Sequence, residues 1–190
     1  MASYVLGLSS GYHDSAVALL KNGEIITAVQ EERFSRIKQD HRFPANAIRA
    51  CLAQGGIGLA DISAIFYYEN PLKKLQRIIS IYFNFGLPGY MSFVSEMPAW
   101  LHKKVHVKRE LRRELASHFG SAATVPQIAY IDHHESHAAA AFFPSPYDEA
   151  AVLCVDGVGE KATTTAWVGS GNTLKKLWEI RFPHSLGLLY

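Results

Sequence analysis

The chain has little of several features that would place it in a special class of protein. Its 190 residues include only two cysteines, Cys51 and Cys154, which both sit in apolar runs. A disulfide framework is therefore excluded, and a reducing compartment is expected. The net charge of +2 is too close to neutral to indicate nucleic acid as a partner. Because 48% of the residues are apolar and 19% are charged, the composition is that of a folded globular protein.

The sequence also lacks a long, uninterrupted apolar run. The first twenty residues carry no basic leader, and His13 and Asp14 interrupt them where a signal peptide needs apolar residues. The longest apolar region, residues 78–100, is broken by two glycines and two prolines. A transmembrane helix needs about 20 apolar residues without such breaks. We therefore expect a cytoplasmic protein that does not associate with a membrane.

The N-terminal thirty residues predict a three-stranded meander. Within residues 4–30, three apolar runs are separated by two turns. The second turn is Asn22-Gly23, and Asn-Gly between apolar runs is the strongest short signal for a hairpin. The first turn holds His13 and Asp14, so these polar side chains are expected beside the end of the first strand.

The remaining sequence alternates between the patterns of helices and strands, which indicates an α/β layer. The expected elements are a charged loop at 31–42, a helix at 44–54, a strand at 62–68, a mainly helical insertion at about 70–120, a strand at 127–131, a helix capped by Asp132 at 132–143, and strands at 150–155, 163–168 and 174–181. The second set of three strands again opens with a turn that carries acidic and glycine residues. This parallel with the first meander suggests a pseudo-duplicated architecture.

Basic side chains dominate the second half of the expected insertion. They accompany a helical stripe of apolar residues, and they are Lys103, Lys104, Lys108, Arg109, Arg112 and Arg113. A solvated face of an amphipathic helix is the interpretation we favour. A patch for an anionic substrate or partner is the alternative.

Two histidines are candidate metal ligands. His133 and His137 are four residues apart on an expected helix, so both imidazoles project from one face and can share a metal. His134 occupies the place where the zincin motif needs a glutamate, which excludes that motif. The pair suits zinc, iron, copper or nickel. The alternative is a helix N-terminus whose histidines are merely hydrogen-bonded.

Asp156 strengthens the metal interpretation. It ends an apolar strand that we expect to be buried, where a carboxylate is costly unless it is paired, hydrogen-bonded or bound to a cation. Together with the two imidazoles it would form a two-histidine, one-carboxylate set with open positions for water or substrate. The alternative is a turn residue that precedes glycine. Gly157 and Gly159 would let the backbone approach phosphate oxygens, although the stretch is neither a P-loop nor a Rossmann fingerprint.

Two further histidines are candidates for acid–base chemistry. His13 lies at a tight turn, where it can act as a general base or donate to a carbonyl, and Asp14 can orient it or cap the turn. A plain surface turn is the alternative. His184 and Ser185 could be read as a base and a nucleophile, but adjacent residues rarely align for proton transfer.

Four stretches, in this order, resemble the N-terminal part of the O-carbamoyltransferases of nodulation and antibiotic tailoring. They are LGLSSGYHDSAVALLKNGEIITAVQEERFSRIKQD, DHHESHAAAAFFPSP, VDGVGEKATT and PHSLGLLY, and they span nearly the whole chain. The resemblance implies an α/β fold of the actin/Hsp70-type ATPase-like (ribonuclease H-like) class. Such a lobe has a mixed sheet flanked by helices and, here, a helical insertion. The same variant occurs in the tRNA threonylcarbamoyladenosine-forming proteins.

The resemblance also implies a site. It assigns a divalent metal, which we expect to be Fe²⁺, to His133, His137 and Asp156, and it places Gly157 and Gly159 beside ATP. It implies transfer of a carbamoyl group from carbamoyl phosphate, through carbamoyl-adenylate, to a hydroxyl of a small-molecule acceptor. His13, with Asp14, would position the carbamoyl group or deprotonate the acceptor.

The length of the chain departs from the family that it resembles. Members of that family are much longer, so we expect residues 1–190 to be the N-terminal lobe without the rest of the fold and without the adenylate-forming domain. Alone, this piece is expected to have little or no transferase activity. A non-catalytic module that binds nucleotide and metal is the alternative function, and a homodimer is left open.

Overall fold

The structure, a computed structural model, describes residues 2–84, 106–120 and 125–189. The chain divides into two compact units. The first unit comprises Met1–Tyr68 and His106–Tyr130, and the second comprises Glu69–Val105 and Ile131–Tyr190. In the described part of the chain, no helix is both long enough and apolar enough to cross a membrane.

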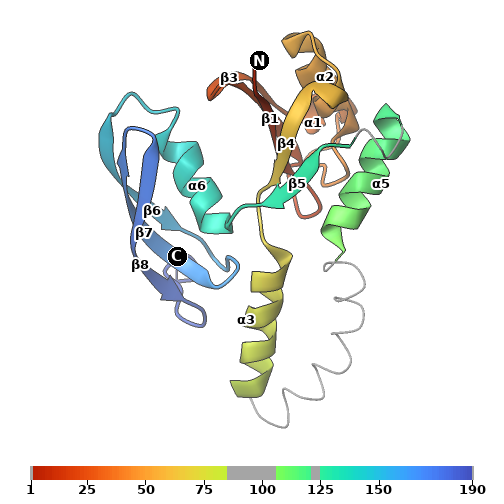
Figure 1. Cartoon of the computed structure of the whole chain (residues 1–190). Helices are drawn as coiled ribbons and strands as arrows, with labels where there is room; N and C mark the ends of the chain where they lie inside the picture. Colours follow the sequence, from red (N-terminus) through yellow and green to blue (C-terminus); the bar gives the residue numbers. More distant parts are fainter. Residues whose placement is uncertain (1, 85–105, 121–124, 190) are drawn as a thin grey trace. The chain divides into compact units, whose positions relative to one another are not determined.

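The first unit is built on a five-stranded mixed sheet (Figure 1). Its strands are β1 (Tyr4–Ser9), β2 (Ala16–Lys21), β3 (Glu24–Gln30), β4 (Ile62–Tyr67) and β5 (Gln127–Tyr130). They lie in the order β3-β2-β1-β4-β5, and β2 runs antiparallel to both of its neighbours, whereas β1, β4 and β5 are parallel. This order and these directions are those of a ribonuclease H-like lobe, so the predicted fold class is confirmed.

The Asn-Gly turn forms where the sequence predicts it. Asn22 and Gly23 both have positive φ, 53° and 89°, which is the requirement of the two-residue turns that match the twist of a hairpin. The Asn22 side chain also accepts a hydrogen bond of 2.9 Å from the Ser3 backbone N–H. The meander β1-β2-β3 is therefore fixed by local sequence.

Helices cover this sheet and close its core. They are α1 (Glu32–Ser35), α2 (Ala45–Gly55), the short 3₁₀ helix η1 (Leu59–Asp61) and α5 (Val107–Phe119). The apolar faces of α2, η1 and α5 meet the strands in one cluster, whose fully buried members include Leu6, Leu19, Ile48, Cys51, Ile65 and Leu115, whereas α1 has no buried residue. The expected apolar face of α2 and the apolar stripe of α5 are thus confirmed where the structure describes them.

The stretch after β3 differs from the expected loop because its first residue is buried. Glu31 lies at the start of α1, and its carboxylate accepts hydrogen bonds from the Ala47 N–H at 2.8 Å and from Asn46 Nδ2 at 2.7 Å. A carboxylate there satisfies free N–H groups in the first turn of α2 and interacts favourably with the helix dipole. Glu31, a charged residue of this stretch, therefore stabilises the start of α2, whereas the sequence predicted a solvent-exposed loop.

The expected insertion is helical wherever it is described. It begins with α3 (Pro71–Asn84) in the second unit and ends with α5 in the first. Arg109, Arg112 and Arg113 lie on the exposed side of α5, as a solvated basic face predicts. Residues 85–105, which include Lys103 and Lys104 of the expected basic face, lie outside the described residues.

The second unit combines α3 and α6 (His133–Phe142) with a three-stranded antiparallel sheet. Its strands are β6 (Glu149–Val155), β7 (Ala162–Ser170) and β8 (Thr173–Arg181). Helix α6 packs on one face of this sheet through Ala138, Cys154 and Trp167 (Figure 1). At the far end of the helix, the Phe142 ring lies directly on Gly169 of β7.

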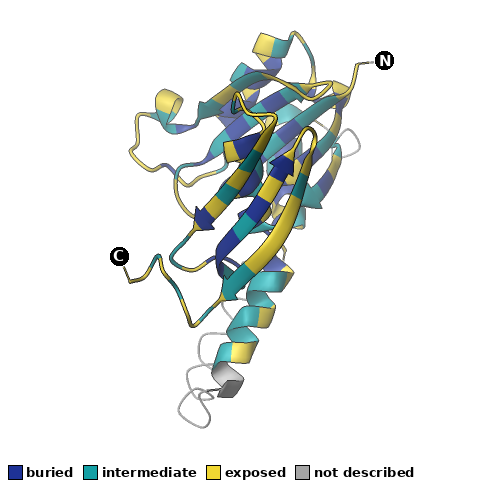
Figure 2. Cartoon of the chain, turned by 90° about the vertical axis from the view of Figure 1, so that its left-hand side faces the viewer, coloured by how far each residue is buried: buried dark blue, intermediate teal, exposed yellow. Residues whose placement is uncertain are grey.

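The expectation that β6 is a buried strand is wrong. Figure 2 shows exposed residues recurring at every second position of β6, with partly buried or buried residues between them. Leu153 and Val155 are 63% and 49% exposed, because alternate residues of a strand point away from the face that α6 covers. The apolar composition of β6 therefore did not indicate burial on both faces.

Candidate metal centre

Helix α6 brings two histidines together on one face. The Nε2 atoms of His133 and His137 are 3.2 Å apart, and the two rings are edge-on at 89° with centroids 4.6 Å apart. This is the consequence of a four-residue spacing on a helix, which places side chains one above the other. The predicted pairing of the two imidazoles is present.

Asp156 completes the cluster from the end of β6. Its Oδ2 lies 3.0 Å from His133 Nε2, and one ligand atom from each of the three residues lies within 4.8 Å of the other two. Metals held by imidazole and carboxylate have ligands at about 2.0–2.2 Å, so neighbouring ligand atoms lie about 3 Å apart. The observed separations fit a single cation.

The charge states of the cluster also suit a cation. Partial burial, reinforced by the neighbouring His133, lowers the pKa of His137. A hydrogen bond with His133 is the main reason that the pKa of Asp156 falls to about 2. At neutral pH the cluster therefore offers a neutral imidazole at His137 and an ionised carboxylate, which are the forms that coordinate metals.

His134, which lies between the two ligand histidines in sequence, belongs to a different environment. It is buried, and its Nδ1 is 2.9 Å from Thr165 Oγ1, which also accepts a 2.7 Å hydrogen bond from Trp167 Nε1. Burial lowers the pKa of His134. This residue joins α6 to β7 and does not enter the cluster.

The two glycines of the loop after β6 differ in the space around them. A Cβ on Gly159 would lie 2.5 Å from the Ala162 carbonyl oxygen and 2.9 Å from His134 Nε2, so no larger residue fits there. A Cβ on Gly157 would meet only Leu188 Cδ2, at the ordinary contact distance of 3.5 Å. Gly159 therefore has a packing role, whereas the space at Gly157 would accept a Cβ, so packing does not explain why that residue is glycine.

Asp132 lies at the N-cap position of α6, but its side chain makes no capping hydrogen bond, so the predicted cap is wrong in its chemistry. The carboxylate instead pairs with Lys73 of α3. A lysine ammonium offers stronger, charge-assisted hydrogen bonding than the neutral N–H groups of the helix.

Helix α3 contributes groups that the sequence did not single out. Arg77 donates a hydrogen bond to the Gly159 carbonyl, and Glu160 accepts one from the Asn70 N–H. Burial raises the pKa of Glu160 and lowers that of Arg77. Lys73 and Arg77 are four residues apart, which places them on one face of α3, and this spacing was the available signal.

A cavity of about 200 Å³ adjoins the cluster and shares His133 with it. Its wall mixes charges of both signs with the Thr165–Trp167 pair, and the charged side chains are Lys73, Asp132, Glu135, Glu160, Lys161, Lys176, Glu179 and Arg181. The cluster is thus next to a polar space large enough for small groups.

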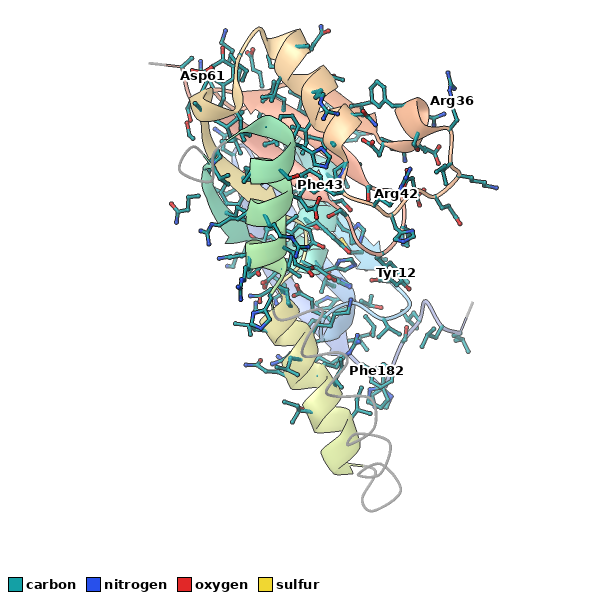
Figure 3. The ribbon with its side chains drawn as sticks, turned by 90° about the vertical axis from the view of Figure 1, so that its right-hand side faces the viewer. Tyr12, Arg36, Arg42, Phe43, Asp61 and Phe182 are labelled. Atoms are coloured by element: carbon teal, nitrogen blue, oxygen red, sulfur yellow. The ribbon has the colours of Figure 1, made fainter. Side chains whose placement is uncertain are left out.

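His13 and Asp14 lie in the first unit, on the loop between β1 and β2, whereas the cluster belongs to the second. His13 Nδ1 is 3.0 Å from Asp14 Oδ2, and the His13 side chain is 61% exposed. Tyr12, labelled in Figure 3, lies on the same loop and packs against the His13 ring. The loop is held at its start by a 2.9 Å hydrogen bond from the Gly11 N–H to the His41 carbonyl.

Comparison with known proteins gives a family match over most of the chain. A family model described as carbamoyltransferase N-terminus matches residues 4–190. An uncharacterized protein of Synechocystis, sll1178, is 52% identical over 190 residues, which are 99% of this chain and 31% of that protein. Nodulation protein NolNO of Sinorhizobium fredii is 34% identical over 181 residues, 94% of this chain and 24% of that protein. The chain thus spans about a quarter to a third of the length of these relatives.

Solved structures give weaker likenesses. YeaZ from Pseudomonas aeruginosa has a TM-score of 0.49 at 14% identity, covering 95% of this chain and 67% of that one. A ROK hexokinase from Thermus thermophilus has a TM-score of 0.42 at 15% identity, covering 96% of this chain and 50% of that one. With TM-scores below 0.5, neither likeness determines the function or the site.

Proposed function

Because this chain belongs to the carbamoyltransferase N-terminus family, we propose that it forms the metal- and nucleotide-binding lobe of an O-carbamoyltransferase. The reaction moves a carbamoyl group from carbamoyl phosphate, through a carbamoyl-adenylate made with ATP, to a hydroxyl of a sugar or natural-product acceptor. The convergence of His133, His137 and Asp156 is the observation that carries this proposal.

The three side chains would hold a divalent cation, and two imidazoles with one carboxylate suit Fe²⁺. Bound there, the cation would supply positive charge that offsets the phosphate charge of ATP. Gly157 and Gly159 would lie beside that nucleotide, since a loop without bulky side chains lets backbone N–H groups approach phosphate oxygens. The surroundings of Gly157 support this role, because a Cβ there would meet only Leu188 Cδ2, at 3.5 Å.

His13 would act on the group that is transferred. Its Nδ1 is held by Asp14, which leaves Nε2 available to accept a proton. In the transfer step, the acceptor oxygen would bond to the carbamoyl carbon while its proton passes to His13 Nε2 and the adenylate oxygen leaves. Asp14 would stabilise the imidazolium that results.

Metal titration of the purified protein tests the centre. Fe²⁺ or Co²⁺ should bind at one equivalent, and His133→Ala or His137→Ala should weaken binding by more than about 100-fold, since even outer-shell changes cost about 10–100-fold. His106→Ala is the matched control, because His106 is exposed and makes no capping hydrogen bond at the start of α5. Unchanged affinity in both ligand variants would refute the assignment.

A non-catalytic module that binds nucleotide and metal predicts the same metal titration. The two functions separate at His13, which lies outside the cluster. In an active, full-length carbamoyltransferase that contains this region, His13→Ala should abolish carbamoyl transfer and leave metal binding unchanged. Full transfer activity in that variant, together with tight nucleotide binding by this region, would favour the non-catalytic module.

A further inference from the structure

The residues that follow β8 fold back onto the loop that carries Asp156. We call residues 182–189 the return segment and residues 156–159 the carboxylate loop. The Ser185 hydroxyl donates to the carbonyls of Asp156, at 3.1 Å, and Gly157, at 2.8 Å. The same oxygen accepts a 3.1 Å hydrogen bond from the Leu188 N–H. Because its proton and its acceptor capacity are both engaged with the backbone, Ser185 is committed to structure and not to attack on a substrate.

Gly187 of the return segment lies against the same backbone. A Cβ at this position would be 2.4 Å from the Asp156 carbonyl oxygen and 2.8 Å from the Gly157 nitrogen. These are backbone atoms, which cannot rotate away as the end of a side chain can. Only glycine therefore allows the return segment to approach the carboxylate loop this closely.

Thr163 of β7 ties the two segments to the sheet. It is fully buried, its carbonyl accepts a 2.8 Å hydrogen bond from the Asp156 N–H, and its hydroxyl donates to the His184 carbonyl at 2.6 Å. Asp156 thus has its N–H held by β7 and its carbonyl held by Ser185. With both backbone groups fixed, only two side-chain torsions remain to place its carboxylate.

We propose that Ser185 and Gly187 are positioning residues of the metal centre: they hold the backbone of Asp156 so that its carboxylate faces His133 and His137. The inference rests on the proposed function, because it needs the cluster to bind a metal. It goes beyond that function because it assigns to the return segment the positioning of a metal ligand. Outer-shell groups of this kind orient the ligands and tune metal affinity.

Titration with Co²⁺, whose visible absorption reports the geometry of its ligands, tests the proposal on the purified protein. Ser185→Ala should weaken Co²⁺ binding on the order of 10-fold and change the absorption spectrum. Gly187→Ala should do the same to a greater extent, and Ser185→Thr, which keeps the hydroxyl, should restore most of the affinity. Thr173→Val is the matched control, since it removes a hydroxyl that donates to the Ser170 carbonyl at the β7–β8 turn.

The outcomes separate this inference from the proposed function. If His133→Ala abolishes Co²⁺ binding while Ser185→Ala and Gly187→Ala bind it as the unaltered protein does, the positioning role is wrong and the metal centre stands. If Co²⁺ does not bind through the three ligands at all, both are wrong. Should Gly187→Ala fail to fold, the comparison of Ser185→Ala with Ser185→Thr decides, and equal affinities in that pair overturn the inference.

Discussion

Replacing Gly169 with alanine should destabilise the second unit by pushing on helix α6. A Cβ at this position would lie 2.6 Å from three carbons of the Phe142 ring, which is 4% exposed. Carbon atoms prefer separations of about 3.5–4.0 Å, so the ring or the helix has to move by about 1 Å. Overpacking of this kind costs about 1–3 kcal/mol, and we expect a loss of about 2 kcal/mol in the free energy of unfolding.

Urea denaturation of a double-mutant cycle measures this effect. Phe142→Ala alone should cost about 3–5 kcal/mol, because it empties a buried site. In that background Gly169→Ala should cost about 1–2 kcal/mol less than it does alone, since its clash partner is gone. Gly157→Ala is the control for the stability measurement, because its Cβ meets only Leu188 Cδ2 at 3.5 Å.

The metal site gives a second measurement on the same variant. Helix α6 carries both histidines, so a displacement caused at Phe142 should also weaken Co²⁺ binding. The reasoning is refuted if Gly169→Ala costs the same with and without the Phe142 ring, because its effect then does not come from this contact.

Two further predictions concern carboxylates of the first unit. Glu31→Ala should lower the free energy of unfolding by about 2 kcal/mol, because it leaves the Ala47 N–H at the start of α2 without its acceptor, and urea denaturation against exposed Glu24→Ala measures this. Hydrogen bonds from Arg42, and secondarily from Ser35, hold the pKa of buried Asp40 well below its usual range. A carboxylate with a depressed pKa stabilises the folded state fully above the unfolded-state pKa of about 3.9, and this contribution is lost as the pH falls toward the folded-state pKa. The difference in free energy of unfolding between Asp40→Asn and the unaltered protein should therefore become smaller from pH 7 to pH 3. A difference that stays constant over this range contradicts the prediction.

Local sequence was sufficient for most of the helices and strands and for the pairing of two of the three candidate ligands. The Asn22-Gly23 turn requires positive φ at adjacent residues, which few sequences other than Asn-Gly supply, so the first meander could be predicted. His133 and His137 pair because of helical geometry alone, which makes their meeting predictable from spacing. Asp156 was predicted from its position at the end of an apolar strand and from the resemblance of the motifs, and its Oδ2 lies 3.0 Å from His133 Nε2.

Contacts between distant residues could not be predicted in the same way. Glu31 caps a helix that begins fourteen residues later, and Lys73 pairs with Asp132 across 59 positions, so no local pattern marks either contact. The exposure of β6 depends on which face α6 covers, and the composition of the strand does not encode that. Arg77 of α3 donates to the Gly159 carbonyl of the carboxylate loop, across 82 positions, and it was not singled out from the sequence.

Each unit contains one buried thiol, Cys51 in the first and Cys154 in the second, and the chain has no other cysteine. Burial raises the pKa of Cys51 to about 11 and also raises that of Cys154. Alkylating reagents react with the thiolate, so either sulfur is shielded until the structure around it opens. The rates of labelling at the two positions therefore report the opening of each unit separately, without any engineered probe.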